Sequence, residues 1–197
     1  PWDCNWPYAP PAGATRPAQT APVVGVAEQT PAVTCGSIVQ VQSQTLGEEE
    51  GVAGTSFALH YQSDRVPGQT AAETLTIPLT GATVPPDVKR IDLVIDVAGQ
   101  RVTESFAPRP NLTYSLTWDG KDAYGQAYRG AASVHTQLGY AYDLVYTAPA
   151  QFGAAFGAVG SGPITADRGR GEVTLWQTWA GTLGDADARG QGLGGWG

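Results

Sequence analysis

Methionine is absent from this chain of 197 residues, and charged residues make up only 15% of it. Lysine and arginine form no run, and the formal net charge is −7. A nucleic-acid-binding protein needs a basic patch to neutralise phosphates, so the composition excludes nucleic acid as a partner. No apolar run approaches the roughly 18 residues of a membrane-spanning helix, so we expect no membrane insertion.

Helical spacing is also missing, because apolar residues nowhere repeat every three or four positions over a long window. Instead, apolar and polar residues alternate in short runs at 37–44, 56–62, 74–79, 90–99, 101–106, 112–118, 132–146 and 172–179. Such alternation is typical of antiparallel strands with one buried face. We therefore predict an all-β fold, an Ig/fibronectin type III-like antiparallel β-sandwich. The acidic stretch "GEEEG" (47–51) is expected to be a solvated loop or a single helical turn.

The segments on either side of the alternating region differ from it in composition. Residues 1–34 are rich in proline, which excludes helix over most of the segment and disfavours sheet interior. We expect an extended arm there, anchored by Trp2, Trp6 and Tyr8. The sandwich is expected to occupy 35–181, and a glycine-rich tail 182–197.

Only two cysteines are present, Cys4 and Cys35. A disulfide between them would close the proline-rich loop, and in the chain-entropy model it would stabilise the fold by about 3–4 kcal/mol. Two unrelated buried thiols are the alternative. We predict the disulfide, because the loop has too little periodicity to order itself.

The stretch "WDGKDAYGQ" (118–126) follows one alternating run and precedes another. Asp-Gly supplies the positive φ of a hairpin, and an aspartate can accept hydrogen bonds from amides two residues further on. The stretch therefore predicts a hairpin turn marked by Trp118, Asp119, Gly120, Asp122 and Gly125, with Trp118 directed inward. A calcium site with Asp119 and Asp122 as ligands is the alternative, but calcium prefers six to eight oxygens.

Catalytic and cofactor motifs are missing. His60, Ser63 and Asp64 lie within five residues of each other, whereas a nucleophile triad draws its members from separate elements. His135 has no cysteine or second histidine near it in the sequence, so zinc is unsupported. We expect no catalytic residues, no bound metal and no cofactor, and therefore no enzyme.

Four stretches together resemble a known family: residues 35–68, 112–130, 138–146 and 172–196. The most specific blocks are "GTSFALHYQSDRVPG" (54–68) and "WDGKDAYGQ". They resemble the fibronectin-plug (FN-plug) domain, which precedes the YD-repeat shell of bacterial RHS and teneurin-like proteins.

The resemblance implies a structural role. In that family the domain is a sandwich-like module without catalysis, and it closes one end of a hollow β-barrel shell. The shell encloses a toxin or forms the body of an adhesion protein. The implied partners are the YD-repeat shell and a β-propeller of the same polypeptide, and the implied location is secreted or on the surface of a bacterial cell.

A plug needs a surface that fits its shell, and aromatic side chains are the favoured anchors of such surfaces. The shell-docking candidates lie in or beside the glycine-rich stretches 147–163 and 181–197 and are Phe152, Phe156, Trp176, Trp179 and Trp196. For Trp176 and Trp179, ordinary core packing is the alternative.

Two other functions compete with the plug. One is a secreted module that binds carbohydrate or a cell surface, with assistance from calcium. The other alternative is a fragment of a glycoside hydrolase. It is weaker, because paired carboxylates need a cleft and a specific separation for that chemistry, and the sequence shows neither.

Overall fold

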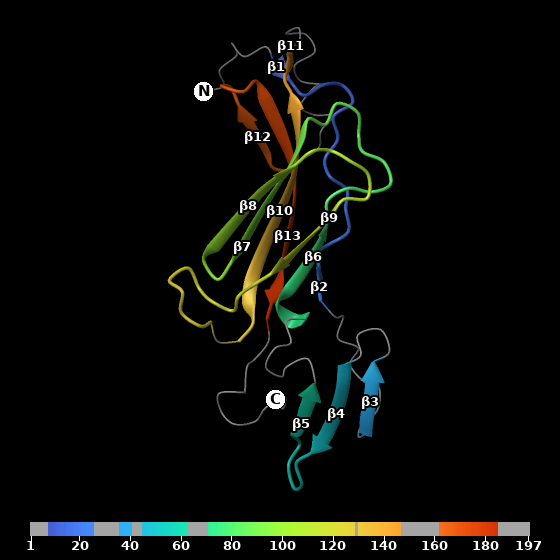
Figure 1. The fold of residues 1–197 in the computed structure, drawn as a ribbon, viewed down its shortest axis with the longest axis vertical. Coiled ribbons are helices and arrows are strands. Elements are labelled where there is room, and N and C mark those ends of the chain that lie inside the picture. The colour runs from blue at the N-terminus through green and yellow to red at the C-terminus, as the bar shows by residue number, and fades with distance from the viewer. Residues whose placement is uncertain are drawn as a thin grey trace.

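Residues 8–25, 36–40, 45–62, 71–128, 130–146 and 162–184 are described by the computed structural model (Figure 1). Within these ranges the regular elements are β-strands, apart from a single 3-10 turn, η2 (Ala71–Glu73). The predicted all-β fold is therefore confirmed. No helix in this part of the chain is long and apolar enough to cross a membrane.

The strands in these ranges pair antiparallel, in four sheets. The largest sheet has the order β12 (Ile164–Asp167), β13 (Glu172–Leu183), β10 (Ala132–Asp143), β7 (Arg90–Val97) and β8 (Gln100–Phe106). The second has the order β2 (Val23–Val24), β6 (Thr74–Pro78) and β9 (Thr113–Thr117). The third has the order β3 (Gly36–Gln40), β4 (Thr45–Gly51) and β5 (Ala58–Gln62), and β1 (Tyr8–Ala9) pairs with β11 (Val145–Tyr146).

The core lies between the five-stranded sheet and the sheet β2-β6-β9. Alternate residues of each central strand face it, as the period of two predicts. The fully buried side chains of β7 are Ile91, Leu93 and Ile95, those of β10 include Leu138, Tyr140 and Tyr142, and Leu75 and Ile77 belong to β6. All of them belong to one cluster, so the two sheets share a single hydrophobic core.

Four strands lie where the sequence predicted none. The acidic stretch 47–51 is the end of β4, not a loop or a helical turn, because it pairs with both β3 and β5. β1 and β2 lie within the segment expected to be an arm and pair with β11 and β6, and β12 pairs with β13. Each of these strands is held by cross-strand hydrogen bonds, for which short sequence windows carry no signal.

The run at 56–62 does form a strand, but the face expected to be buried is exposed. Phe57 is 75% exposed and Leu59 is 39% exposed. Figure 1 shows the sheet β3-β4-β5 at the opposite end of the molecule from β1 and β11, apart from the five-stranded sheet. Among the described residues no second layer covers that face, so the alternation does not lead to burial there.

The segment 8–25 is fixed to the five-stranded sheet by polar contacts. Arg16 donates to the carbonyl oxygens of Gly162, Pro163 and Trp176 at 2.6, 2.6 and 3.0 Å. The hydroxyl of Tyr142 donates to the Thr15 carbonyl at 2.7 Å. Arg16 therefore joins the segment to the start of β12 and to the Trp176 carbonyl at the edge of β13.

Candidate functional site

The stretch 118–126 connects two different sheets, and although Lys121 and Ala127 form a local antiparallel bridge, its flanking strands do not form a hairpin. β9 belongs to the three-stranded sheet and β10 to the five-stranded sheet, and the two strands do not pair. Trp118 is buried in the core at 4% exposure, and its Nε1 donates to the Lys121 carbonyl at 2.8 Å. The Tyr128 ring packs edge-on against Trp118, with the ring centroids 5.8 Å apart. The hairpin prediction is wrong because the flanking strands lie in different sheets.

The two aspartates of this loop are engaged by its own turns. Asp119 Oδ1 accepts from the Lys121 amide at 3.0 Å. Asp122 Oδ1 accepts from the amides of Tyr124 and Gln126, both at 2.9 Å. Gly120 and Gly125 have positive φ values of 71° and 76°. No group of three histidine, cysteine, aspartate or glutamate residues in the described ranges is placed to hold a metal ion.

Gln100 ties this loop to the turn between β7 and β8. Its Nε2 donates to Asp119 Oδ1 at 3.2 Å and to the Lys121 carbonyl at 2.9 Å. The Ala123 amide also donates to the Ala98 carbonyl at 3.1 Å. The loop is therefore held rigidly against β7 and β8, while Tyr124 at its tip is 90% exposed.

The two tryptophans of β13 lie on opposite faces of their sheet. Successive side chains of a strand alternate between faces, so positions three apart point opposite ways. Trp176 lies on the outer face, where its Nε1 donates to Thr165 Oγ1 at 2.8 Å. Trp179 packs against the hydrophobic core. The pair cannot contribute to a single docking patch on one face.

An apolar groove of about 280 Å³ adjoins Trp179, between β2 and the far half of β13. Its walls come from the residues Pro22, Val24, Leu75, Val134, Trp179 and Gly181. Phe152, Phe156 and Trp196, the other docking candidates, lie outside the described residues, so their role stays a prediction.

The remaining predicted residues do not gather into a reactive site. His60 Nδ1 lies 4.0 Å from a carboxylate oxygen of Glu49, on two neighbouring strands, and Ser63 and Asp64 lie outside the described residues. No catalytic site is evident in the described part of the chain. Cys4 and Cys35 are also outside it, so the predicted disulfide gains no support.

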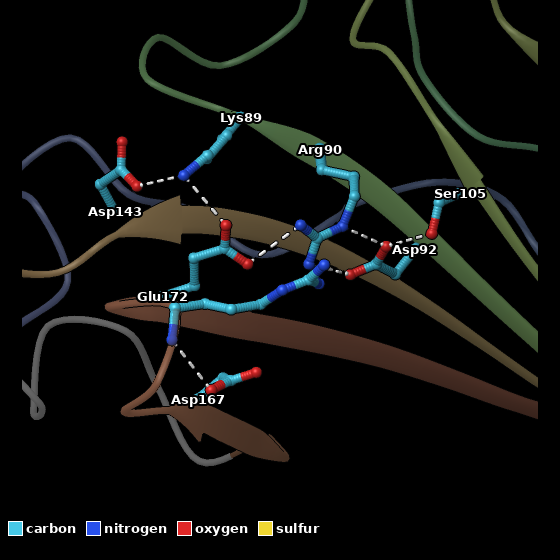
Figure 2. Close-up of polar contacts among 8 residues, drawn as sticks. Lys89, Arg90, Asp92, Ser105, Asp143, Asp167 and Glu172 are labelled. Atoms are coloured by element: carbon cyan, nitrogen blue, oxygen red, sulfur yellow. Dashed lines mark hydrogen bonds and ion pairs between the residues drawn. The ribbon is translucent and has the colours of Figure 1, made fainter.

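A charged cluster that the sequence did not reveal joins the ends of β7, β10 and β13 (Figure 2). Glu172 is buried at 5% exposure, with Lys89 Nζ and Arg90 Nη1 each 3.0 Å from its carboxylate oxygens. Lys89 Nζ also lies 2.8 Å from Asp143, and Arg90 Nε lies 2.7 Å from Asp92. The cluster links two positive and three negative side chains across the sheet.

The charges of the cluster stabilise each other. The hydrogen bond from Lys89, followed by that from Arg90, holds the pKa of Glu172 below its usual value against the opposing effect of burial. Hydrogen bonds to Asp143 and then Glu172 raise the pKa of Lys89. All the acids have basic partners here, so the arrangement is that of a structural clamp and not of an acid–base pair.

Residues 74–147 match the family model described as "Teneurin 1-4, FN-plug domain". This segment is similar to the FN-plug domain of teneurins. It begins with β6 and ends just after β11, and it therefore includes β7, β8, β9 and β10 as well as the loop 118–126. The resemblance to this domain is confirmed over that range.

Teneurins from several animals are similar to about half of the chain. Mouse teneurin-3 is 33% identical over 102 residues, which are 52% of this chain. Human teneurin-4 is 34% identical over 100 residues, or 51% of the chain, and Caenorhabditis elegans teneurin-1 is 33% identical over 115 residues, or 58%. The aligned part spans about 4% of the length of each relative.

Proposed function

We propose that this chain is a non-catalytic structural plug, which caps or seals the hollow YD-repeat β-barrel shell of a teneurin-like or RHS protein. The FN-plug match over residues 74–147 carries the proposal. That range contains the central strands of the shared core, so the matched part is the body of the molecule. An Ig/fibronectin-like sandwich, built from the two sheets around this core, would supply the rigid body that a plug needs.

Exposed aromatic side chains support a docking role. Tyr124, Phe57 and Tyr146 are 90%, 75% and 70% exposed. Aromatic residues at a surface are favoured anchors in protein interfaces, because they bury a large area with little loss of conformational freedom. Tyr124 is presented by the loop that Gln100 holds in place, so this side chain is the described aromatic best positioned to contact a shell wall.

The partner and the location follow from the same proposal. The YD-repeat shell and a β-propeller of the same polypeptide would be the partners, and similarity to teneurins supports a cell-surface location. A bacterial origin stays a prediction, and the comparisons give no support for a toxin cargo.

The proposed function can be tested by measuring whether this chain keeps solutes out of the shell. A parent protein that carries both this chain and a YD-repeat shell would receive a fluorophore on the inner wall of the shell. A soluble quencher should reach the fluorophore slowly in the intact protein and quickly after deletion of residues 1–197. The substitution Tyr124→Ser should speed quenching, and Thr103→Ser on the exposed face of β8 serves as the matched control. Equal quenching with and without the chain would contradict the proposal.

A further inference from the structure

One long edge of the five-stranded sheet is incompletely paired. β10 pairs with β13 along its whole length, whereas β12 opposes only Glu172 to Leu175 on the other side. The next amide on that side, Trp176, donates to the Pro163 carbonyl at 3.0 Å, and the Trp176 carbonyl accepts from Arg16. Backbone groups of alternate residues point to the same side of a strand. Those of Thr178, Ala180 and Thr182 therefore point to the open edge, and they have no partner among the described residues.

The open part of β13 carries no residue of its own that disfavours pairing. Edge strands are commonly shielded by charges or proline, which disfavour another strand. The outer strand β8 carries Arg101 and Glu104, and β12 follows Pro163 and ends on Asp167. From Val173 to Gly184 the sequence of β13 and its end holds no charged residue and no proline. The open part of β13 can therefore accept a further strand without a charge penalty.

The open edge is complementary to itself. In an antiparallel pairing centred on Ala180, Thr178 of each copy lies opposite Thr182 of the other, and Trp179 lies opposite Gly181. Within this fold, threonines already pair across strands, since Oγ1 of Thr74 and Oγ1 of Thr117 are 3.0 Å apart. A tryptophan also lies over a glycine on the neighbouring strand, since Gly139 pairs with Trp176. Both kinds of contact between two copies thus have an example within one copy.

The apolar groove beside the edge provides the space for such a contact. Gly181 lines it together with Val134 and Trp179, and a Cβ at position 181 would have only Val134 Cγ1 nearby, at 3.7 Å. A bulky side chain from an opposing strand can therefore lie over Gly181. The uncharged strand removes like-charge contacts at the centre, which matters for two molecules of net charge −7.

We propose that a second copy of this chain pairs antiparallel with the open edge of β13, around Ala180, to form a two-fold symmetric dimer. The dimer joins the two five-stranded sheets into one continuous sheet through the backbone groups of residues 178, 180 and 182. An isologous contact of this kind closes on itself and leaves no further open partner site on either β13. This proposal is independent of the plug function.

Sedimentation of the full chain over a range of concentrations tests the dimer. We expect a concentration-dependent dimer, and hydrogen exchange at the amides of residues 178, 180 and 182 should slow as the dimer forms. Ala180→Pro removes an amide that points to the open edge, a position where proline is tolerated in a monomer, and it should abolish dimerisation. Gly181→Ala should weaken dimerisation at least tenfold, because it fills the place of the opposing Trp179.

Gly81→Ala is the matched control, since a Cβ there meets nothing within 4 Å and the position lies away from β13. Thermal melting should show that all variants remain folded. A wild-type chain that stays monomeric, with fast exchange at the three amides, would overturn the proposal and leave the edge for a strand of a different protein. A dimer of unchanged affinity in Gly181→Ala and Ala180→Pro would overturn it equally.

Discussion

Gly139 of β10 lies directly opposite Trp176 of β13, and the tryptophan ring occupies the space that a side chain at position 139 would need. A Cβ at this position would lie 2.7 Å from Trp176 Cε3 and 2.5 Å from Thr174 Cγ2. Trp176 is also held by its hydrogen bond to Thr165, so the ring cannot move away without breaking that bond. The glycine is therefore a packing requirement of this sheet and not a source of flexibility.

The first prediction concerns this contact. Gly139→Ala should lower the free energy of unfolding by about 1–3 kcal/mol, because it overpacks the outer face of the sheet. Chemical denaturation measures the change, and Gly81→Ala, where a Cβ meets nothing, should change stability by much less. Equal effects of the two substitutions would show that the ring of Trp176 does not press on Gly139.

The second prediction concerns the turn between β7 and β8. Ala98 and Gly99 have positive φ values of 48° and 80° between the paired residues Val97 and Gln100. A two-residue hairpin turn with both central residues at positive φ favours Asn-Gly, whereas alanine is strained there. Ala98→Asn should therefore stabilise the domain by about 0.5–1 kcal/mol in chemical denaturation. Ala98→Val, whose branched side chain tolerates this φ least, should destabilise it, and a neutral result for both would refute the assignment of strain.

The third prediction concerns Glu172. Glu172→Gln removes the negative charge that faces Lys89 and Arg90, and it should lower the stability at neutral pH. The loss should be only about 1–2 kcal/mol, because the two basic side chains still reach solvent. Asp143→Asn is the matched control, since this carboxylate is 68% exposed and its ion pair with Lys89 is open to solvent. Its effect should be smaller.

The stability difference between wild type and Glu172→Gln should depend on pH in a defined direction. The folded-state pKa of Glu172 lies below its unfolded value, mainly because of the hydrogen bond from Lys89. Its stabilising contribution is therefore present above the unfolded pKa and is lost as the pH falls through the folded pKa. The difference between wild type and Glu172→Gln, measured by denaturation at a series of pH values, should shrink under acidic conditions. A constant difference would rule out the ionised carboxylate as its source.

The fourth prediction separates the turn from a calcium site. Asp122→Ala removes the acceptor for two backbone amides and should destabilise the domain by about 1 kcal/mol. Because the carboxylates are engaged in the turns, the melting temperature of the wild-type chain should be the same with calcium and with a chelator. A large fall of the melting temperature in chelator would restore Asp119 and Asp122 as calcium ligands.

The sequence predicts most of the core and little of the surface arrangement. Alternation places Ile91, Leu93 and Ile95 inward correctly, because burial on one face of a strand leaves a period of two in the sequence. The same alternation places Trp176 and Trp179 on opposite faces of β13, yet the sequence makes both of them docking candidates because both are aromatic. The cluster of Lys89, Arg90 and Glu172 depends on strand register, and nothing local in the sequence connects residues so far apart along the chain.

The hairpin prediction for the loop 118–126 is wrong for the same reason, because strand pairing depends on residues far away in the sequence. Asp-Gly and the alternating flanks favour a hairpin, but the choice between pairing and crossing to another sheet depends on the other strands. β9 pairs with β6 and β10 pairs with β7 and β13, so the two flanking strands already have partners. The local turns of Asp119 and Asp122 form in either case.

The position of this domain in its parent protein tests the central claim most directly. Electron cryomicroscopy of a parent protein that contains both this chain and a YD-repeat shell should show the matched residues 74–147 inside one opening of the shell, with Tyr124 against its wall. Density for the domain outside the shell, with both openings clear, would contradict the plug.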